Sequence, residues 1–115
     1  MKTIDVAKII DKDLAIMDTD GQKVFDNISK ALKNNEIVVL DFSGISLIIS
    51  AFMNAAIGQL YRDYDSNFLN NKLKIEGLSP DDLTLLKRVN ERAKIFYSEK
   101  KKEIIEILDK EYENE

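Results

Sequence analysis

The residues best placed to do chemistry are Asp41 and Ser43, at the end of the apolar run in residues 36–42 (EIVVLDF). A run that is apolar on both faces predicts a buried strand in the middle of a sheet covered on two sides. Ligand sites in open α/β sheets gather at the carboxyl ends of such strands. Asp41 and Ser43 are therefore candidates for a small-ligand site.

Two interpretations of Asp41 stay open at this level. The first is an aspartate that hydrogen-bonds the turn after it, as aspartates commonly do. The second is a phosphoacceptor of the receiver type, which also needs an acidic pair from another strand to hold a divalent ion. Residues 9–13 (IIDKD) would supply such a pair if the first strand ends there.

Composition excludes most catalytic chemistry. The chain has no histidine and no cysteine, which removes hydrolase triads and the usual zinc ligands. None of its four glycines has the spacing of a P-loop or a dinucleotide fingerprint. Residues 18–21 (DTDG) match only half of a calcium loop and are interpreted as helix-capping residues. We therefore expect a protein that is not an enzyme and has no metal site and no cofactor.

Size and charge indicate one soluble domain. The chain has 115 residues, of which 33% are charged, and a net charge of −4. The acidic balance argues against a nucleic-acid partner, which would require a basic surface. No apolar run approaches the ~20 residues that a membrane span needs, and the N-terminus lacks the apolar stretch of a secretory signal. We expect a cytoplasmic protein with no membrane segment.

Hydrophobic patterning predicts the elements that would position these residues. Strands are expected over residues 1–10, 14–17, 36–42 and 72–76. Helices are expected over residues 20–33 and 51–64, with Ser50 as the N-cap of the second, and residues 65–71 are expected to form a polar loop. This alternation predicts an α/β fold with a mixed sheet of four or five strands and about four helices.

The C-terminal third begins with a clear helix signal, because Ser79 can act as N-cap and Pro80 occupies the first helical position. Residues 95–97 fit either a continuation of this helix or a short edge strand. Residues 98–115 are charge-rich, and the lysines at 100–102 predict a solvated, salt-bridged face. We expect a domain over residues 1–97 and then a terminal helix that packs on the domain or on a partner. Homodimerisation is compatible with its apolar stripe, which comprises Ile104, Ile105, Leu108 and Tyr112.

Residues 40–45 (LDFSGI) and 49–58 (ISAFMNAAIG) together resemble the central segment of STAS domains, which occur in sulfate transporters and anti-sigma factor antagonists. The likeness is closer still to the bacterial STAS-like family DUF4325. There, an Asp-Phe strand end leads into a helix that opens on Ser-x-Phe, as Ser50-Ala51-Phe52 does here. The resemblance implies a regulatory protein-interaction module that takes part in partner switching. It suggests a GHKL-type ATPase or an anti-sigma-like regulator as the partner.

By this resemblance the partner-binding surface comprises Ser46, Ile49, Ser50, Ala51, Phe52 and Asn54. The anti-sigma antagonist motif reads Asp-Ser-Ser/Thr-Gly at the helix start, so its acidic position falls on Ile49 and its phosphoacceptor position on Ala51. Ser50 is the remaining hydroxyl, and it would act either as the helix N-cap or as a phosphorylation site. The alternative function is a domain that binds a small ligand, a nucleotide or a lipid, near Asp41 and Ser43.

Overall fold

The computed structural model describes the backbone of residues 1–113 and the side chains of residues 1–110. Within these residues the strands are β1 (Lys2–Asp5), β2 (Leu14–Ala15), β3 (Val38–Asp41), β4 (Leu47–Ile48) and β5 (Leu73–Glu76). The α-helices are α1 (Val6–Ile10), α2 (Asp18–Lys33), α3 (Ser50–Ala56), α4 (Ser66–Lys72) and α5 (Pro80–Glu113). A short 3₁₀ helix, η1 (Gly58–Arg62), follows α3.

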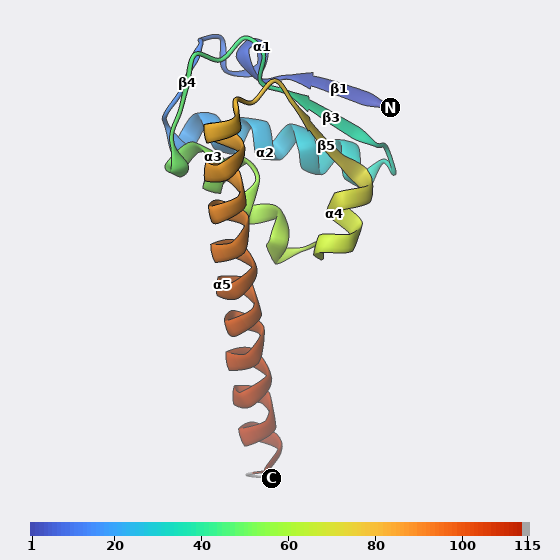
Figure 1. The fold of residues 1–115 in the computed structure, drawn as a ribbon. Coiled ribbons are helices and arrows are strands. Elements are labelled where there is room, and N and C mark those ends of the chain that lie inside the picture. Colours follow the sequence, from blue (N-terminus) through green and yellow to red (C-terminus); the bar gives the residue numbers. More distant parts are fainter. Residues whose placement is uncertain (114–115) are drawn as a thin grey trace.

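The strands form two small parallel sheets (Figure 1). One has the order β1-β3-β5, and the other is a ribbon of β2 and β4. The α/β class is confirmed. The expectation of a single mixed sheet is wrong, because the five strands of the described residues form two parallel sheets. The same residues contain five α-helices, close to the expected number of about four. Every connection between paired strands crosses over through helices, and crossovers of that length bring strands together in parallel.

The main sheet is covered on one face only. Ile4 and Leu40 are paired in register and are buried, together with Val38, on the face toward the helical core. On the opposite face Val39 lies between Thr3 and Lys74, and both of these neighbours are exposed. The central strand was expected to be covered on two sides, and that is wrong. Val39 is nonetheless only 8% exposed.

The loose alternation of the first ten residues suggested a single strand, and that is wrong, because they form a strand followed by a helix. β1 ends at Asp5, whose carboxylate accepts a hydrogen bond of 3.3 Å from the backbone N–H of Lys8 and caps α1. Val6 and Ile10 are one helical turn apart and both are buried. The apolar residues after Asp5 therefore belong to a helix, because the cap satisfies an otherwise free N–H at its start.

Residues 51–72 differ from the expected secondary structure in two places. The single helix expected over 51–64 is interrupted, since α3 ends at Ala56 and η1 begins at Gly58. The polar loop expected over 65–71 is helix α4. Asp65 caps α4 by accepting a hydrogen bond of 2.8 Å from the N–H of Phe68, and the Phe68 ring stacks on Tyr64 with centroids 4.7 Å apart. Leu69 anchors α4 in the core.

The helix signal at Ser79 and Pro80 is confirmed. The Ser79 hydroxyl accepts a hydrogen bond of 3.1 Å from the N–H of Asp82, and Pro80 is the first helical residue. α5 continues through residues 95–97 as helix, so the edge-strand alternative is wrong. It also runs without a break across the expected boundary at residue 97. In the part of the chain described here, no helix is both long enough and apolar enough to cross a membrane.

The second half of α5 does not pack on the domain. Residues 98–110 are all exposed, and Figure 1 shows this part of the helix extending well beyond the rest of the molecule. The expectation that it packs on the domain is wrong for these residues, whereas packing on a partner stays a prediction. The side chain of Tyr112, the last member of the expected stripe, lies outside the described residues.

Candidate functional site

Asp41 holds the turn that follows β3. Its Oδ1 accepts hydrogen bonds from the backbone N–H of Ser43 at 2.9 Å and from the Ser43 hydroxyl at 2.6 Å. These two hydrogen bonds to the charged form hold the pKa of the Asp41 carboxyl below its ordinary value. Gly77 packs against the same turn with φ +81°, where a Cβ would lie 2.5 Å from the Ser43 nitrogen. The turn interpretation of Asp41 is confirmed.

The receiver interpretation requires Asp11 and Asp13 to form an acidic pair that holds a divalent ion. Asp11 ends α1 in a left-handed conformation with φ 56°. Asp13 accepts a hydrogen bond of 2.7 Å from the Ser46 hydroxyl. In the residues that the structure describes, no three acidic, histidine or cysteine side chains gather closely enough to hold a metal ion. The expectation of a protein without catalytic function stays a prediction.

Ser46 ties the β2–β4 ribbon together. Its backbone N–H donates to the carbonyl of Asp13 at 2.8 Å, and three residues on, Ile49 donates to the carbonyl of Ala15 at 3.1 Å. Ala15 and Ile48 face the core, so their neighbours Leu14 and Leu47, paired in register, face outward. Ser46, which precedes β4, is exposed, but its hydroxyl already donates a hydrogen bond to Asp13.

An apolar strip on the outer side of this ribbon was not anticipated from the sequence. It comprises Leu14 and Leu47 of the ribbon together with Ile16 and Met17, which follow β2 in the chain, and these residues are between 36% and 55% exposed. The short apolar runs around these residues were visible, but the face on which each residue lies depends on the ribbon's register. A cluster of large exposed side chains is typical of an interaction surface.

The strip leads directly into α3. Ser50, Ala51 and Asn54 form the exposed face of this helix, named here the α3 ridge. Phe52 and Met53 are fully buried, and Ile49 is half-buried. Placing Phe52 on the partner-binding surface is therefore wrong, because a partner cannot contact its side chain in this fold. The N-cap interpretation of Ser50 is also wrong, since Ile49 is the N-cap and Ser50 is the first helical residue.

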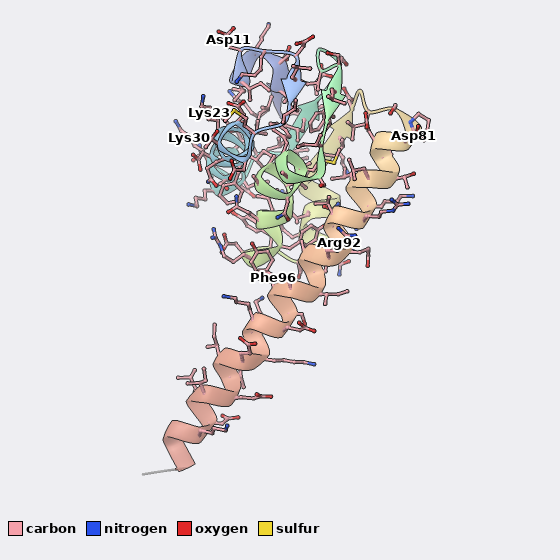
Figure 2. The ribbon with its side chains drawn as sticks, turned by 90° about the vertical axis from the view of Figure 1, so that its left-hand side faces the viewer. Asp11, Lys23, Lys30, Asp81, Arg92 and Phe96 are labelled. Atoms are coloured by element: carbon pink, nitrogen blue, oxygen red, sulfur yellow. The ribbon has the colours of Figure 1, made fainter. Side chains whose placement is uncertain are left out.

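Two hollows lie on either side of the α3 ridge. The first, of about 390 Å³, is formed with α5, and the second, of about 520 Å³, with the start of α2. Ala51 and Asn54 line both. Figure 2 shows Arg92 and Phe96 on α5, with Phe96 close to the point where the helix leaves the body. The first hollow is lined by Ser50, Ala51, Asn54, Val89, Arg92, Ala93, Phe96 and Tyr97.

The second hollow lies where α2 and α3 pack closely. A Cβ on Gly21 would lie 2.7 Å from the backbone oxygen of Phe52 and 2.8 Å from the Ala55 Cβ. At the rim of the hollow the Gln59 side-chain amide donates to Gln22 Oε1 at 2.9 Å and to the Ala55 carbonyl at 2.7 Å. Because Gly21 has no side chain, α3 can pack close to α2, and this close packing positions the α3 ridge.

The buried carboxylate of Asp20, in the first turn of α2, forms ion pairs with two partly exposed lysines. Its side chain is 5% exposed, and its Oδ2 lies 2.8 Å from Lys12 Nζ, with Lys23 Nζ 3.6 Å from the other oxygen. The hydrogen bond from Lys12 is the main reason that the pKa of Asp20 lies below its ordinary 3.8, and it outweighs the opposing effect of burial. The helix-capping interpretation of Asp20 is wrong, since the N-cap is Met17.

This ion pair predicts a loss of stability in acid. A carboxyl whose pKa is lower in the folded state stabilises the fold fully above its unfolded pKa, and the gain disappears as the pH falls through the folded pKa. We expect Asp20→Asn to unfold at a lower temperature than wild type above pH ~4. The gap should close progressively below that pH. Thermal unfolding of both proteins from neutral pH to pH ~2 measures this, and a gap independent of pH would contradict it.

Comparison with known protein families identifies the fold. The model of the STAS-like domain of unknown function (DUF4325) matches residues 20–83, more than half of the chain. The chain belongs to this family. The resemblance drawn from residues 40–58 is thereby confirmed. No curated protein and no solved structure gave a significant match. The matched part of the STAS-like domain begins at Asp20 and includes β4, the whole of the α3 ridge and the first turn of α5.

Proposed function

We propose that this STAS-like domain is a non-catalytic regulatory module that binds a protein partner across the α3 ridge and the adjoining apolar strip. The observation that carries the proposal is that Ser50, Ala51 and Asn54 form a low ridge between two hollows. Small side chains let a partner approach the helix backbone closely. The hollows on either side can take larger side chains, which is how interfaces concentrate their binding energy.

The surroundings of the ridge favour a protein over a small ligand. The apolar strip of Leu14, Ile16, Met17 and Leu47 continues the surface over the ribbon, so the exposed area is extended and not confined to one cavity. Arg92 and Tyr97 on α5 line the opposite side, and arginine and tyrosine are enriched among residues that dominate binding. The resemblance to anti-sigma antagonists makes a GHKL-type ATPase or an anti-sigma-like regulator the partner class to test first.

Regulation by phosphorylation would have to use Ser50, since Ala51 occupies the phosphoacceptor position of the anti-sigma antagonists. Ser50 is exposed at the first position of α3, so a kinase could reach its hydroxyl. A phosphate there would add up to about two negative charges on the ridge.

A matched pair of asparagine variants tests the docking surface. Asn54 lies on the ridge and Asn67 on α4, and both are exposed helical residues. We expect Asn54→Arg to reduce capture of the partner from native cell extract at least ~10-fold, because truncating or blocking a central contact costs more than ~1.4 kcal/mol of binding. Asn67→Arg should capture it as wild type does. Quantitative affinity capture with all three proteins measures this.

If no captured protein distinguishes Asn54→Arg from Asn67→Arg, the docking proposal fails. The competing function is then a nucleotide or lipid site, since the hollow of about 390 Å³ is within the size range of small-ligand pockets. A thermal-shift screen with nucleotides and lipids separates the two, because a bound ligand raises the unfolding temperature by mass action.

A further inference from the structure

The exposed second half of α5 continues the face that packs on the domain. Leu86, Val89 and Ala93 on this face are buried in the core. Ile104 and Ile107 follow about five helical turns after Leu86 and Val89, so they lie on the same side of the helix. They are 56% and 58% exposed, and Leu108 beside them is 47% exposed. An apolar stripe of Ile104, Ile107 and Leu108 thus extends past the end of the domain, with Ile107 in place of the Ile105 that the sequence pattern suggested.

A basic hollow lies at the root of this stripe, where α5 leaves the body. It has a volume of about 450 Å³ and combines apolar with cationic side chains. Its lining comprises Arg62, Phe96, Tyr97, Lys100, Lys101 and Ile104. Aromatic walls with three cations around them fit a chain segment that is both apolar and acidic.

The charge of the chain reverses along the same helix. Lys100, Lys101 and Lys102 precede the stripe, and with the flanking Glu99 and Glu103 they give residues 99–103 a net charge of +1. Residues 109–115 contain four acidic residues and one lysine, a net charge of −3. The apolar stripe therefore lies between a segment of net positive charge and a segment of net negative charge. A surface with this polarity is complementary to itself when it is turned end over end.

We propose that the stripe is covered by a second copy of this chain, with the two α5 helices antiparallel and centred on residues 104–108. Antiparallel pairing brings the lysines at 100–102 of each copy toward the acidic end of the other. Parallel pairing would instead place lysines against lysines and acids against acids, which is destabilising along a helix pair. The acidic end of one copy then reaches the basic hollow of the other. This inference does not require the proposed docking function, although Phe96 and Tyr97 line both the basic hollow and the first hollow beside the α3 ridge.

Charge reversal provides a test that does not depend on folding. We expect the full-length protein to form dimers in analytical ultracentrifugation, more weakly at high salt because the charges are screened. A variant with Lys100→Glu, Lys101→Glu and Lys102→Glu should be monomeric, since both of its ends are acidic. A variant with Asp109→Lys, Glu111→Lys and Glu113→Lys should be monomeric because both of its ends are basic. An equimolar mixture of the two should form dimers again.

A second measurement determines the orientation. The chain has no cysteine, so a spin label can be attached only at an introduced Ser98→Cys. With α5 helices antiparallel about residue 106, the two labels should be separated by roughly 20–25 Å along the axis, from the helical rise of about 1.5 Å per residue. In parallel helices they would lie side by side. A wild-type chain that stays monomeric, charge variants that dimerise alone, or adjacent labels would each overturn the proposal.

Discussion

Replacement of Phe52 by alanine is expected to lower the free energy of unfolding by about 3–5 kcal/mol, the cost found when a buried aromatic side chain is truncated. Phe52 has no exposed surface and lies in the core below the α3 ridge, next to the equally buried Met53. A domain of this size has a total stability of about 5–15 kcal/mol. The variant should therefore be partly unfolded at physiological temperature, which chemical denaturation followed by circular dichroism would measure.

The matched control is Phe96→Ala. The Phe96 side chain is 52% exposed on α5, and exposed substitutions usually change stability by less than ~0.5 kcal/mol. The comparison is made at protein concentrations low enough to keep the chain monomeric. Equal losses of unfolding free energy in Phe52→Ala and Phe96→Ala would contradict the burial of Phe52. Phe52 would then again be a candidate for the partner-binding surface.

The burial of Phe52 also decides which substitutions can be used to map the docking surface. Phe52→Asp would place a charge in the core, which is more damaging than truncation. Loss of partner binding in that variant would report unfolding and would not locate the interface. Asn54→Arg avoids this ambiguity because Asn54 is exposed.

Gly21→Ala should lower the free energy of unfolding by about 1–3 kcal/mol, the range found for overpacked sites. The added Cβ would lie 2.7 Å from the Phe52 backbone oxygen and 2.8 Å from the Ala55 Cβ. Relieving these contacts requires α3 to move away from α2, because neither atom is at the end of a flexible side chain. The higher helix propensity of alanine, about 1 kcal/mol, offsets part of the cost. Thermal unfolding should show a decrease of several degrees.

Gly58→Ala is the control for this prediction. A Cβ at Gly58 would lie 2.6 Å from Asn54 Oδ1, but its next contact across the interface, the Ala93 Cβ, is at 3.6 Å. The Asn54 amide is the mobile end of an exposed side chain and can rotate away. We expect a change in stability within ~0.5 kcal/mol. A destabilisation at Gly58 as large as that at Gly21 would show that close helix packing is not the cause.

Gly21→Ala should affect partner binding at the α3 ridge as well as the stability of the fold. Because Gly21 sets the distance between α2 and α3, a side chain there should displace the α3 ridge and alter the hollow between them. If Gly21→Ala folds, its capture of the partner should decrease together with its stability. Unchanged capture by a folded variant would indicate that the partner uses only the α5 side of the ridge.

Local patterns in the sequence determined several features of this protein. Interactions between residues close in the chain account for three of them: the Ser79-Pro80 start of α5, the buried strand through residues 38–41 and the Asp41–Ser43 turn. The family could be recognised from residues 40–58 because that segment combines a strand end, a turn and a helix start in a fixed order. Each of these signals depends on neighbours within a few positions.

Features that depend on contacts between distant residues could be decided only by the tertiary structure. The family resemblance placed Phe52 on the partner-binding surface, yet its side chain lies in the core, because which face of a short helix is buried depends on what packs against it. Asp20 resembled a cap, but Lys12 reaches it from the preceding loop. The outward face of Leu14 and Leu47 follows from their pairing across the ribbon. The projection of α5 beyond the domain follows from where the core ends, which the periodicity of the helix does not reveal.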